Sequence, residues 1–407
     1  MKSQDAFIID GCRTAIGNFG GTLSHVRTDD LAAFVIQELM KKQVALDPSL
    51  ISDVILGCAN QAGEDNRNVA RMALLLAGLP WTVPGETVNR LCASGMSAVV
   101  HAFRAIKSGE GSCFISGGVE NMTRGPWVIN KASAPFGRDA EMHDSSFGWR
   151  FINPQMKVLY GTDSMGTTAE NLAVKYSISQ SRQDEFALLS QQKTLKAMES
   201  GRLEKEIKPI EVRISKKETT QFSIDEFAKP GTSIEILNKL RPAFNPNGSV
   251  TAGNSSGLND GAAAVLVAAT DFVQDYALKP LARIVSSGVC GVEPKIMGIG
   301  PVPATKLALD RAGLTLNDMQ IIELNEAFAA QSLACLDEWK ISPDDERLNP
   351  NGGAISLGHP LGMSGARIVY SAALELHLTG KQYALCTMCI GVGQGYAVVL
   401  ENADYCL

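Results

Sequence analysis

The sequence predicts an α/β protein in which one sheet-building unit occurs twice. Short apolar runs alternate with helical segments over residues 6–118, which is typical of a mostly parallel sheet with helices on both faces. Residues 121–241 break this alternation, and the last third of the chain then repeats the first in outline. A chain of 407 residues, 45% apolar and 20% charged, is long enough for such a fold with an ample core.

The first unit is assigned in order from its apolar runs and its turn residues. A loop punctuated by glycines, from Gly11 to Gly21, follows the first strand. Asp29 or Asp30 is expected to cap the first helix. The predicted elements are strands at 6–10, 54–58, 86–88 and 113–116, and helices at 31–41, 68–76 and 98–106.

Residues 121–241 are predicted to form an insertion between two sheet units. They carry their own apolar periodicity, which a linker lacks. A buried strand at 261–268 then returns the chain to the first sheet. The parts of the insertion are an irregular stretch up to residue 153, helical segments near 167–176 and 182–200, and a charged segment at 205–217.

The last third is predicted to repeat the first. We match Cys92 with Asn325, because each is placed at the start of a helix, and residues 116–118 with 389–391. Few residues are identical between the two units, so the duplication rests on the order of the elements. Those elements are a strand at 281–286, a helix at 303–312, a strand at 321–324, a helix opened by residues 325–328 and a strand at 383–386.

Charge and cysteine content exclude several classes of protein. The net charge of −6 argues against a general nucleic-acid binder, although it leaves room for a local basic pocket. Nine cysteines without framework spacing indicate a reducing compartment and not a disulfide scaffold. No apolar run reaches membrane-spanning length, no basic segment precedes a long apolar run near the N-terminus, and residues 404–407 are no peroxisomal address. We therefore expect a cytoplasmic protein without nucleic-acid or membrane partners.

Cys92 is the first candidate for a reacting group. It is placed where a predicted strand turns into a helix, among residues small enough to let a ligand approach. The unpaired N–H groups and positive dipole end of a helix start lower a thiol pKa and favour the nucleophilic thiolate. The alternative is a small buried structural cysteine, which is the commoner role of a lone cysteine.

Two further segments carry unusual residues. His359 lies in a glycine-rich loop stiffened by proline, which exposes an imidazole that can activate a thiol; the alternative is a hydrogen-bonded structural histidine. Cys386 and Cys389 form a Cys-x-x-Cys pair, which is weak evidence for zinc or redox chemistry without a second pair. The glycines after Cys389 favour backbone N–H groups turned toward a ligand, as an oxyanion hole requires.

Together these segments resemble the thiolase family over essentially the whole chain. The resemblance implies a thiolase-like duplicated five-layer αβαβα fold with an inserted loop domain, assembled as a homotetramer built from dimers. The motifs that carry it occur in the family's order and are Asn89–Gly95, Thr251–Gly257, Asn325–Phe328, Gly358–Pro360 and Cys389–Gly391. The implied domains are residues 1–121 with 242–272 for the N-terminal half, 122–241 for the loop domain that binds CoA and mediates oligomerisation, and 273–407 for the C-terminal half.

The resemblance assigns a role to each unusual residue. Thiolases cleave a 3-ketoacyl-CoA with CoA, or run the Claisen condensation in reverse. Cys92 would attack the C3 ketone while His359 takes its proton, and the N–H groups of Cys92 and Gly391 would hold the oxyanion. His359 and a water held by Asn325 would stabilise the enolate of the leaving acetyl-CoA, which Cys389 would protonate. CoA would then take the acyl group from Cys92, with no permanently bound cofactor and no metal.

The same resemblance implies where CoA binds. It puts Ser256 and Ala252 beside the pantetheine, and Lys229 against the adenine where relatives usually have an arginine. Lysine keeps the charge of arginine but loses its planar stacking. Phenylalanine and methionine, which are implied to line the channel, are without the resemblance more often part of a core. The residues implied to line the channel are Phe244, Phe328, Met156 and Met165.

Within the family, the chain is most similar to the 3-oxoadipyl-CoA thiolases of aromatic-acid breakdown, which release succinyl-CoA and acetyl-CoA. Residues 166–168, Gly-Thr-Thr, depart from that group and match the acetoacetyl-CoA enzymes, although those have a histidine where this chain has Ser164. We expect 3-oxoadipyl-CoA as substrate, with acetoacetyl-CoA or a broad range of 3-ketoacyl-CoA as the alternative. The similar stretches are residues 59–71, 147–154, 160–165 and 386–389. The candidates to bind the distal carboxylate, unless they are surface or intersubunit charges, are Arg150, Arg124 and Arg138.

Other classes of protein explain fewer of these residues. A decarboxylating ketoacyl synthase pairs a cysteine with a histidine but has no need of Cys389. A papain-like protease also places a cysteine at a helix start, yet none of its signatures occurs here. A zinc or redox protein would use only Cys386 and Cys389. A non-catalytic acyl-CoA carrier would have no reason to keep all four reactive groups.

Overall fold

A mixed ten-stranded sheet runs through the computed structural model, which describes residues 4–406. Leu407, the end of the C-terminal tetrapeptide, lies outside the described residues. The sheet order is β12-β13-β14-β11-β1-β10-β5-β3-β4, with β2 paired to β10. The strands are β1 (Ala6–Arg13), β2 (Gly17–Asn18), β3 (Asp53–Gly57), β4 (Gly85–Val88), β5 (Cys113–Asn121), β10 (Asn259–Ala269), β11 (Ala282–Gly291), β12 (Ile321–Leu324), β13 (Tyr383–Ile390) and β14 (Gln394–Asn402).

The prediction of a mostly parallel sheet is wrong. Parallel pairing joins β3 to β4 and β5, and β12 to β13, whereas the other pairings within this sheet are antiparallel. Two strands cause the difference. β10 returns from the insertion and runs between β1 and β5, and β14 follows β13 through a three-residue turn that needs no crossover helix.

The sheet consists of two halves of similar topology, joined where β1 pairs with β11. The first half has the order β4-β3-β5-β10-β1, and the second has β12-β13-β14-β11 with its outermost strand reduced to a bridge between Ile322 and Leu348. β12 therefore corresponds to β3. The long helix Leu361–Thr379, which comes after Leu348, corresponds to the helix Ser94–Ser108, which comes after β4.

This correspondence corrects the predicted match of Cys92 with Asn325. Cys92 lies two residues before α3 (Ser94–Ser108), and His359 lies two residues before α12 (Leu361–Thr379). The nucleophile candidate is thus matched by His359. The second predicted match pairs the right strands, β5 and β13, but not the right residues. Gly57 at the end of β3 opposes Gly118 on β5, and Leu324 at the end of β12 opposes Thr387 on β13. Residues 116–118 therefore match 385–387.

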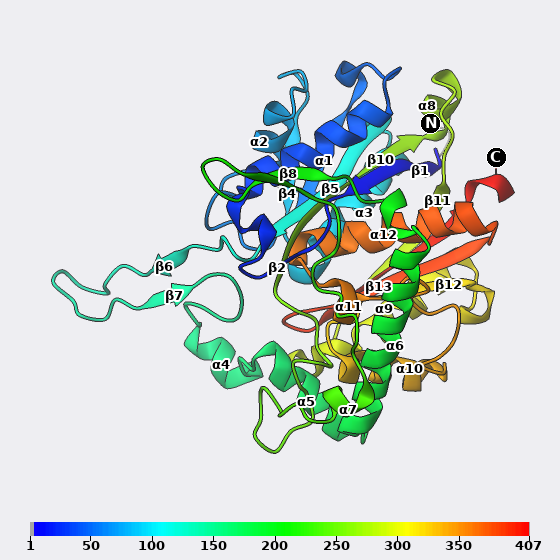
Figure 1. Cartoon of the computed structure of the whole chain (residues 1–407). Helices are drawn as coiled ribbons and strands as arrows, with labels where there is room; N and C mark the ends of the chain where they lie inside the picture. The colour runs from blue at the N-terminus through cyan, green and yellow to red at the C-terminus, as the bar shows by residue number, and fades with distance from the viewer. Residues whose placement is uncertain (1–3, 407) are drawn as a thin grey trace.

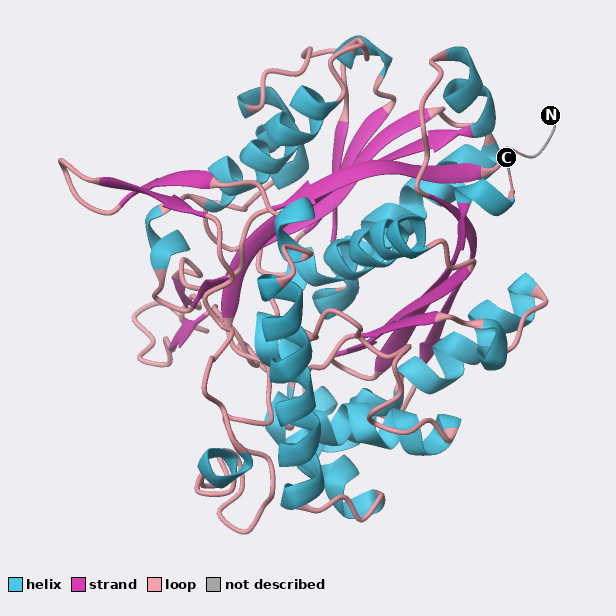
Figure 2. Cartoon of the chain, turned by 45° about the vertical axis from the view of Figure 1, so that its right-hand side comes forward, coloured by secondary structure: helices cyan, strands magenta, loops and turns pink. Residues whose placement is uncertain are grey.

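Helices complete five layers, as predicted from the resemblance. α1 (Thr28–Lys42) and α2 (Val69–Leu76) cover the outer face of the first half, and α9 (Pro301–Ala312) and α10 (Ala329–Trp339) lie outside the second half. α3 and α12 pack against each other between the halves, where the curved sheet bends around them (Figure 2). α12 is buried along most of its length because its sequence is apolar or small on all sides.

Several element boundaries differ from the prediction. β1 continues to Arg13, so the predicted loop after residue 10 is partly sheet. Asp29 and Asp30 lie in the first turn of α1 and do not cap it. α10 begins at Ala329, and the segment Asn325–Phe328 is not helical because it carries the chain from β12 across the centre of the molecule.

The inserted segment forms one long hairpin and a layer of helices. The hairpin of β6 (Trp127–Ile129) and β7 (Met142–Asp144) projects far from the body (Figure 1). The segment's remaining elements are α4 (Pro154–Tyr160), α5 (Met165–Lys175), α6 (Gln180–Glu199), β8 (Ile210–Arg213), β9 (Thr219–Phe222) and α7 (Ile234–Leu237). α5 and α6 pack against α10, so the segment is anchored on the second half. From residue 4 to residue 406, no helix has the length and apolar character needed to cross a membrane.

Candidate active site

Cys92 lies in a strained turn between β4 and α3. Leu91, its neighbour, has φ of +48°, a conformation that is costly for a side chain of this size. Asn89 Oδ1 accepts the Leu91 N–H at 2.9 Å. Ser94 Oγ accepts the Arg90 N–H at 2.9 Å and donates to the Leu91 carbonyl at 2.7 Å. These bonds hold the turn in a shape that presents the half-buried Cys92 thiol ahead of α3.

Glycines bring the starts of α3 and α12 together. A Cβ on Gly95 would lie 2.5 Å from the carbonyl oxygen of Gly362, and a Cβ on Gly118 would lie 1.9 Å from the same atom. Both distances are shorter than any contact between non-bonded carbon and oxygen atoms, so only glycine fits at these two positions. The close approach places the residues just before the two helices, Cys92 and His359, at the same point between the halves.

His359 is held as a neutral base. Its Nδ1 lies 2.7 Å from Ser364 Oγ, whose own hydrogen is donated to the Pro360 carbonyl at 2.8 Å. Ser364 Oγ therefore accepts from the ring, so Nδ1 carries the hydrogen and Nε2 is unprotonated. Burial, together with the charge of Arg367, lowers the pKa of His359 to about 4. The imidazole is thus uncharged at neutral pH.

The loop that carries His359 is fixed from the first half. Asn259 Oδ1 accepts the His359 N–H at 2.9 Å, and Asn259 Nδ2 donates to the Gly17 carbonyl at 3.0 Å. Gly358 has φ of +105°, and a Cβ there would lie 2.6 Å from Asn259 Cγ. The sequence analysis missed Asn259; its only signal was an amide at the entrance to an apolar strand.

Asn325 and Cys389 complete the group. Asn325 Nδ2 lies 3.5 Å from His359 Nε2, and its buried Oδ1 has no hydrogen-bond partner among residues 4–406. A buried orphan acceptor of this kind is the place for an ordered water or a ligand group. Cys389 is fully buried at the end of β13, where burial first and then the nearby Cys92 thiol raise its pKa well above the ordinary value.

Gly391 turns its N–H toward the nucleophile candidate. The N–H groups of Gly391 and of Cys92 itself lie close enough to the Cys92 sulfur to lower the pKa of the thiol. Gly391 belongs to the tight turn after β13, in which the next residue, Val392, has φ of +65°. A β-branched residue in this region is strained, and such strain is common where a backbone group must be aimed precisely.

The prediction that the helix start lowers the pKa of Cys92 is wrong. Burial raises that pKa above its ordinary value, and the two N–H groups oppose this effect only in part. The buried Glu120 carboxyl raises the pKa further. Cys92 therefore rests as a thiol, so it requires a base such as His359.

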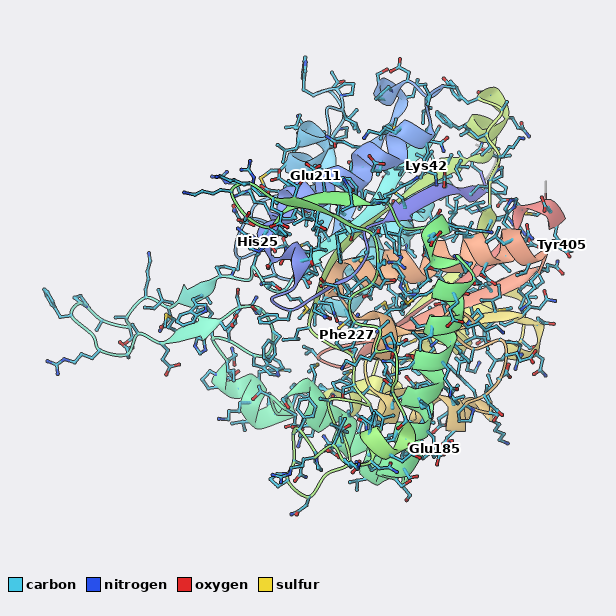
Figure 3. All side chains as sticks on the ribbon, viewed as in Figure 1. His25, Lys42, Glu185, Glu211, Phe227 and Tyr405 are labelled. Atoms are coloured by element: carbon cyan, nitrogen blue, oxygen red, sulfur yellow. The ribbon has the colours of Figure 1, made fainter. Side chains whose placement is uncertain are left out.

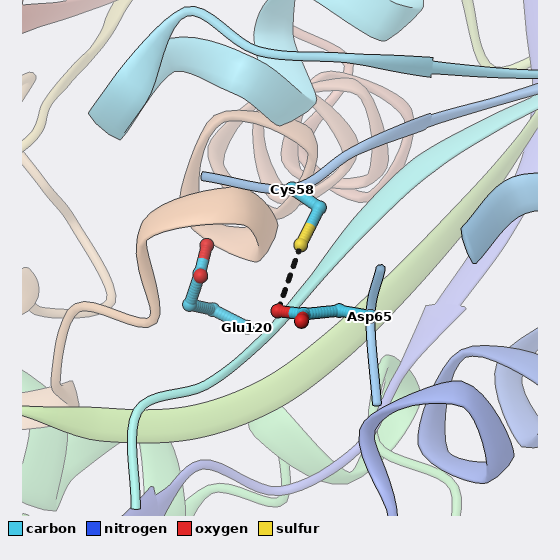
Figure 4. Close-up of side chains that lie close together, drawn as sticks. All are labelled: Cys58, Asp65 and Glu120. Atoms are coloured by element: carbon cyan, nitrogen blue, oxygen red, sulfur yellow. Dashed lines mark hydrogen bonds between the residues drawn. The ribbon is translucent and has the colours of Figure 1, made fainter. Parts of the chain in front are cut away.

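Cys58, Asp65 and Glu120 form a buried cluster beside the site (Figure 4). Their potential ligand atoms lie within 4.8 Å of one another, and Cys58 Sγ lies 3.4 Å from Asp65 Oδ2. The Asp65 oxygens already accept the N–H groups of Gln61 at 3.1 Å and Gly63 at 2.9 Å. We therefore interpret the cluster as a hydrogen-bonded anchor and assign it no metal.

Glu120 links the two halves at the site. Its carboxyl accepts the N–H of Gly362 in the first turn of α12 at 2.8 Å, and those of Ala59 and Asn60 at 2.9 Å each. Burial raises its pKa to about 7, against the effect of these donors. Glu120 thus positions the helix that follows His359. The sequence analysis missed it, because nothing near residue 120 in the chain indicates a partner at residue 362.

Glu326 is a second positioning residue that the sequence analysis did not single out. It accepts hydrogen bonds from Ser190 Oγ at 2.6 Å, Asn349 Nδ2 at 2.6 Å and the Ile355 N–H at 3.2 Å. A Cβ on Gly353 would lie 2.1 Å from its carboxyl carbon. Glu326 therefore ties the segment after Asn325 to the loop that leads to His359.

Part of the predicted CoA channel lies together. The rings of Phe244 and Phe328 meet edge to face, with centroids 6.0 Å apart. The N–H and the hydroxyl of Ser256 each donate to the Ala327 carbonyl at 3.0 Å. A Cβ on Gly391 would lie 3.5 Å from Met165 Sδ, so Met165 borders the turn that faces Cys92.

The other three predicted CoA residues lie nearer the surface. Ala252 is exposed, and Met156 is half-buried on α4. Lys229 Nζ lies 4.9 Å above the centroid of the Phe227 ring, which is labelled near the centre of Figure 3. The Lys229 N–H donates to Gln191 Oε1 at 3.0 Å, which fixes its backbone beside α6.

Two of the three arginines predicted for a distal carboxylate are badly placed. Arg124 Nε donates to Glu64 at 2.7 Å, and Arg124 also donates to the Ser24 carbonyl at 2.9 Å. Arg138 is exposed on the projecting hairpin. Arg150 is half-buried, with a single long bond of 3.4 Å to the Ser145 carbonyl.

Comparison with known proteins identifies related chains. Residues 6–271 match the family description "Thiolase, N-terminal domain" and residues 278–402 match "Thiolase, C-terminal domain". The chain is 56% identical over 399 residues to the 3-oxoadipyl-CoA/3-oxo-5,6-dehydrosuberyl-CoA thiolase of Escherichia coli, with 98% of this chain and 100% of that protein covered. It is 53% identical over 400 residues to the beta-ketoadipyl-CoA thiolase of Pseudomonas aeruginosa, at the same coverage. Its structure superposes on human mitochondrial 3-ketoacyl-CoA thiolase with a TM-score of 0.91 at 40% identity, covering 98% of this chain and 99% of that one.

Proposed function

The chain belongs to the thiolase family, and on that premise we propose that it cleaves 3-oxoadipyl-CoA with CoA to give acetyl-CoA and succinyl-CoA. Membership makes the protein an acyltransferase. The choice of substrate is supported by full-length identities of 53–56% to relatives named for that reaction. The observation that carries the chemistry is the unprotonated Nε2 of the neutral His359, which lies 3.5 Å from Asn325 Nδ2 where the segment of Cys92 packs against α12.

In the first step, Cys92 Sγ attacks the C3 ketone carbon while His359 Nε2 accepts the thiol proton. A base is required because Cys92 rests as a thiol. The N–H groups of Cys92 and Gly391, which lie near the sulfur at rest, stabilise the negative charge on the former ketone oxygen. The strained turns at Leu91 and Val392 keep these donors in place, so little reorganisation is needed when charge develops.

The C2–C3 bond then breaks, leaving a succinyl thioester on Cys92 and the enolate of acetyl-CoA. A protonated His359 and a water held by Asn325 Oδ1, which has no partner among residues 4–406, stabilise the enolate oxygen. Cys389 gives its proton to C2, a role that suits a buried thiol whose high pKa keeps the proton until a carbanion-like base appears.

In the second half-reaction, CoA replaces acetyl-CoA and its thiol attacks the succinyl thioester of Cys92. Once the proton that His359 took from Cys92 has passed to the Cys389 thiolate, the neutral His359 accepts the CoA proton, and the same two N–H groups hold the second oxyanion. When this oxyanion collapses, the Cys92 thiolate leaves and takes the proton back from His359. Phe244, Phe328, Met165, Met156, Ser256 and Ala252 form the pantetheine channel in this proposal, and Lys229 contacts the adenine. CoA is thus a substrate, and the chain needs no resident cofactor.

Residues 122–241 act in this proposal as the loop domain for CoA binding and assembly, between the halves formed by 1–121 with 242–272 and by 273–407. The hairpin exposes Trp127 by 69%, Ile129 by 67% and Phe136 completely, which supports a homotetramer in which hairpins from different copies cover one another. Nine unpaired cysteines support a cytoplasmic location.

A substrate panel tests the proposed activity. We expect kcat/KM for 3-oxoadipyl-CoA well above that for acetoacetyl-CoA in a CoA-dependent cleavage assay. Equal or reversed values would instead favour the acetoacetyl-CoA alternative.

Assembly is tested by light scattering of Trp127→Glu with Ile129→Glu, which should dissociate tetramers into dimers. Val44→Glu, at a residue 89% exposed elsewhere, is the matched control and should remain tetrameric.

A further inference from the structure

A small pocket lies where the inserted segment meets the second half of the molecule. Trp149, Tyr160 and Met165 line it from the insertion, and Lys295 and Val392 line it from the second half. None of the arginines proposed for the distal carboxylate belongs to this lining.

The pocket adjoins the reacting groups. Val392 is the residue after Gly391, whose N–H lies close enough to the Cys92 sulfur to lower the pKa of the thiol. Met165 Sδ lies 3.5 Å from the Cβ position of Gly391. The turn that faces Cys92 therefore borders the pocket, whose volume of about 10 Å³ has to widen to admit a carboxylate. In a succinyl group the distal carboxylate follows the thioester carbon after three carbon–carbon bonds of about 1.5 Å each.

Lys295 supplies an uncommitted positive charge at this pocket. Its backbone carbonyl accepts from Asn171 Nδ2 at 2.9 Å, and its Cε would lie 3.1 Å from a Cβ on Gly161. The backbone is thus held, while the side chain passes Gly161 and is exposed. Throughout residues 4–406, no carboxylate lies within 4.0 Å of the Lys295 ammonium.

We propose that Lys295 binds the distal carboxylate of the acyl chain and so makes the enzyme selective for dicarboxylic 3-ketoacyl-CoA. The proposal rests on the proposed function, whose substrate it explains. Lys295 and Tyr160 are exposed and Trp149 is half-buried, so a charged hydrogen bond formed here is only partly removed from water.

Asp163 allows the direction of the charge effect on substrate preference to be tested. It lines the same pocket, and Asn171 Nδ2 donates to its Oδ2 at 3.1 Å. Its negative charge repels a substrate carboxylate and competes with it for Lys295. Removing this charge should therefore favour the dicarboxylic substrate, whereas removing Lys295 should disfavour it.

The experiment compares 3-oxoadipyl-CoA with 3-oxohexanoyl-CoA, which has the same chain length but ends in a methyl group. The measured quantity is the ratio of the two kcat/KM values in the full-length enzyme. Lys295→Met should lower this ratio roughly 5- to 20-fold, Lys295→Arg should largely keep it, and Asp163→Asn should raise it. Lys306→Met, at an exposed lysine on α9 outside the pocket, is the control and should leave it unchanged.

The outcomes separate this proposal from the proposed function. A wild-type enzyme that does not prefer 3-oxoadipyl-CoA would overturn the proposed function and this inference with it. A wild-type preference that survives Lys295→Met would overturn the inference alone. The inference also fails if Lys295→Met slows both substrates equally, because a structural role would do the same.

Discussion

The centre of the molecule and the inserted segment at residues 122–241 differ in how tightly they are built. Around Cys92 the helix starts approach so closely that Gly95 and Gly362 have no room for a Cβ. In the inserted segment, Gly148 has no neighbouring atom within 4 Å of its Cβ position, and Phe136 is fully exposed. The comparison teaches that the residues proposed for the bond-making chemistry lie in a tightly packed centre, while the segment proposed for substrate choice and assembly is more open.

The largest expected effect is at the nucleophile. Cys92→Ala removes the acceptor of the acyl group, so kcat should fall by about 10⁴-fold or more. Cys290→Ala, which removes a half-buried thiol outside the site, is the matched control and should keep most of the activity. Both are measured by CoA-dependent cleavage. Substantial activity of the Cys92 variant would break the claim that the centre carries the chemistry.

Cys389→Ala separates two steps within the centre. Cleavage should fall by about 10²- to 10⁴-fold, because C2 loses its proton donor. Acylation of Cys92 by succinyl-CoA needs no proton at carbon and should remain measurable by exchange with labelled CoA. If thiolysis persisted in full, a decarboxylating synthase would fit the site better than a thiolase.

The residues proposed for the chemistry were recognised in the sequence by type and local pattern. Cys92, His359, Asn325, Cys389 and Gly391 all occur in recognisable local patterns, and the structure brings them to adjacent helix starts and strand ends. The local alternation of strands and helices was also sufficient to place most elements of both halves.

What the sequence did not predict depends on distant pairs. Glu120 acts on Gly362, and Asn259 acts on His359, across 242 and 100 residues of chain. The direction of β10 depends on the return path of the insertion, which no local pattern encodes. The raised pKa of Cys92 follows from burial in the assembled fold, whereas the sequence showed only the nearby helix start.

A pair of glycine variants measures the difference in packing directly. Gly95→Ala forces α3 away from α12, so we expect a loss of roughly 2–3 kcal/mol in stability and about 10- to 100-fold in kcat. Gly148→Ala meets no atom and suffers only from its φ of +78°, which costs about 1 kcal/mol. Thermal unfolding and kcat check both variants. Similar losses in the two would contradict the contrast between centre and insertion.

The smallest expected effect is a shift in pH dependence. Burial lowers the pKa of His359 to about 4, so the base stays neutral well below the ordinary histidine range. The acid limb of kcat/KM should accordingly lie below pH 6. The unfolded chain protonates His359 at a higher pH than the folded protein does. The contribution of His359 to stability is therefore present above about pH 6.5 and is lost as the pH falls toward 4. An acid limb at the ordinary histidine pKa would show that water reaches His359 more readily than its burial indicates.

Trapping the acyl-enzyme tests the central claim most directly. The enzyme is mixed with 3-oxoadipyl-CoA without free CoA, quenched in acid, and its peptides are analysed by mass spectrometry. We expect one succinyl adduct, on Cys92, formed together with an equal amount of acetyl-CoA and discharged when CoA is added. An adduct on another residue, or the release of acetyl-CoA without any adduct, would contradict the account.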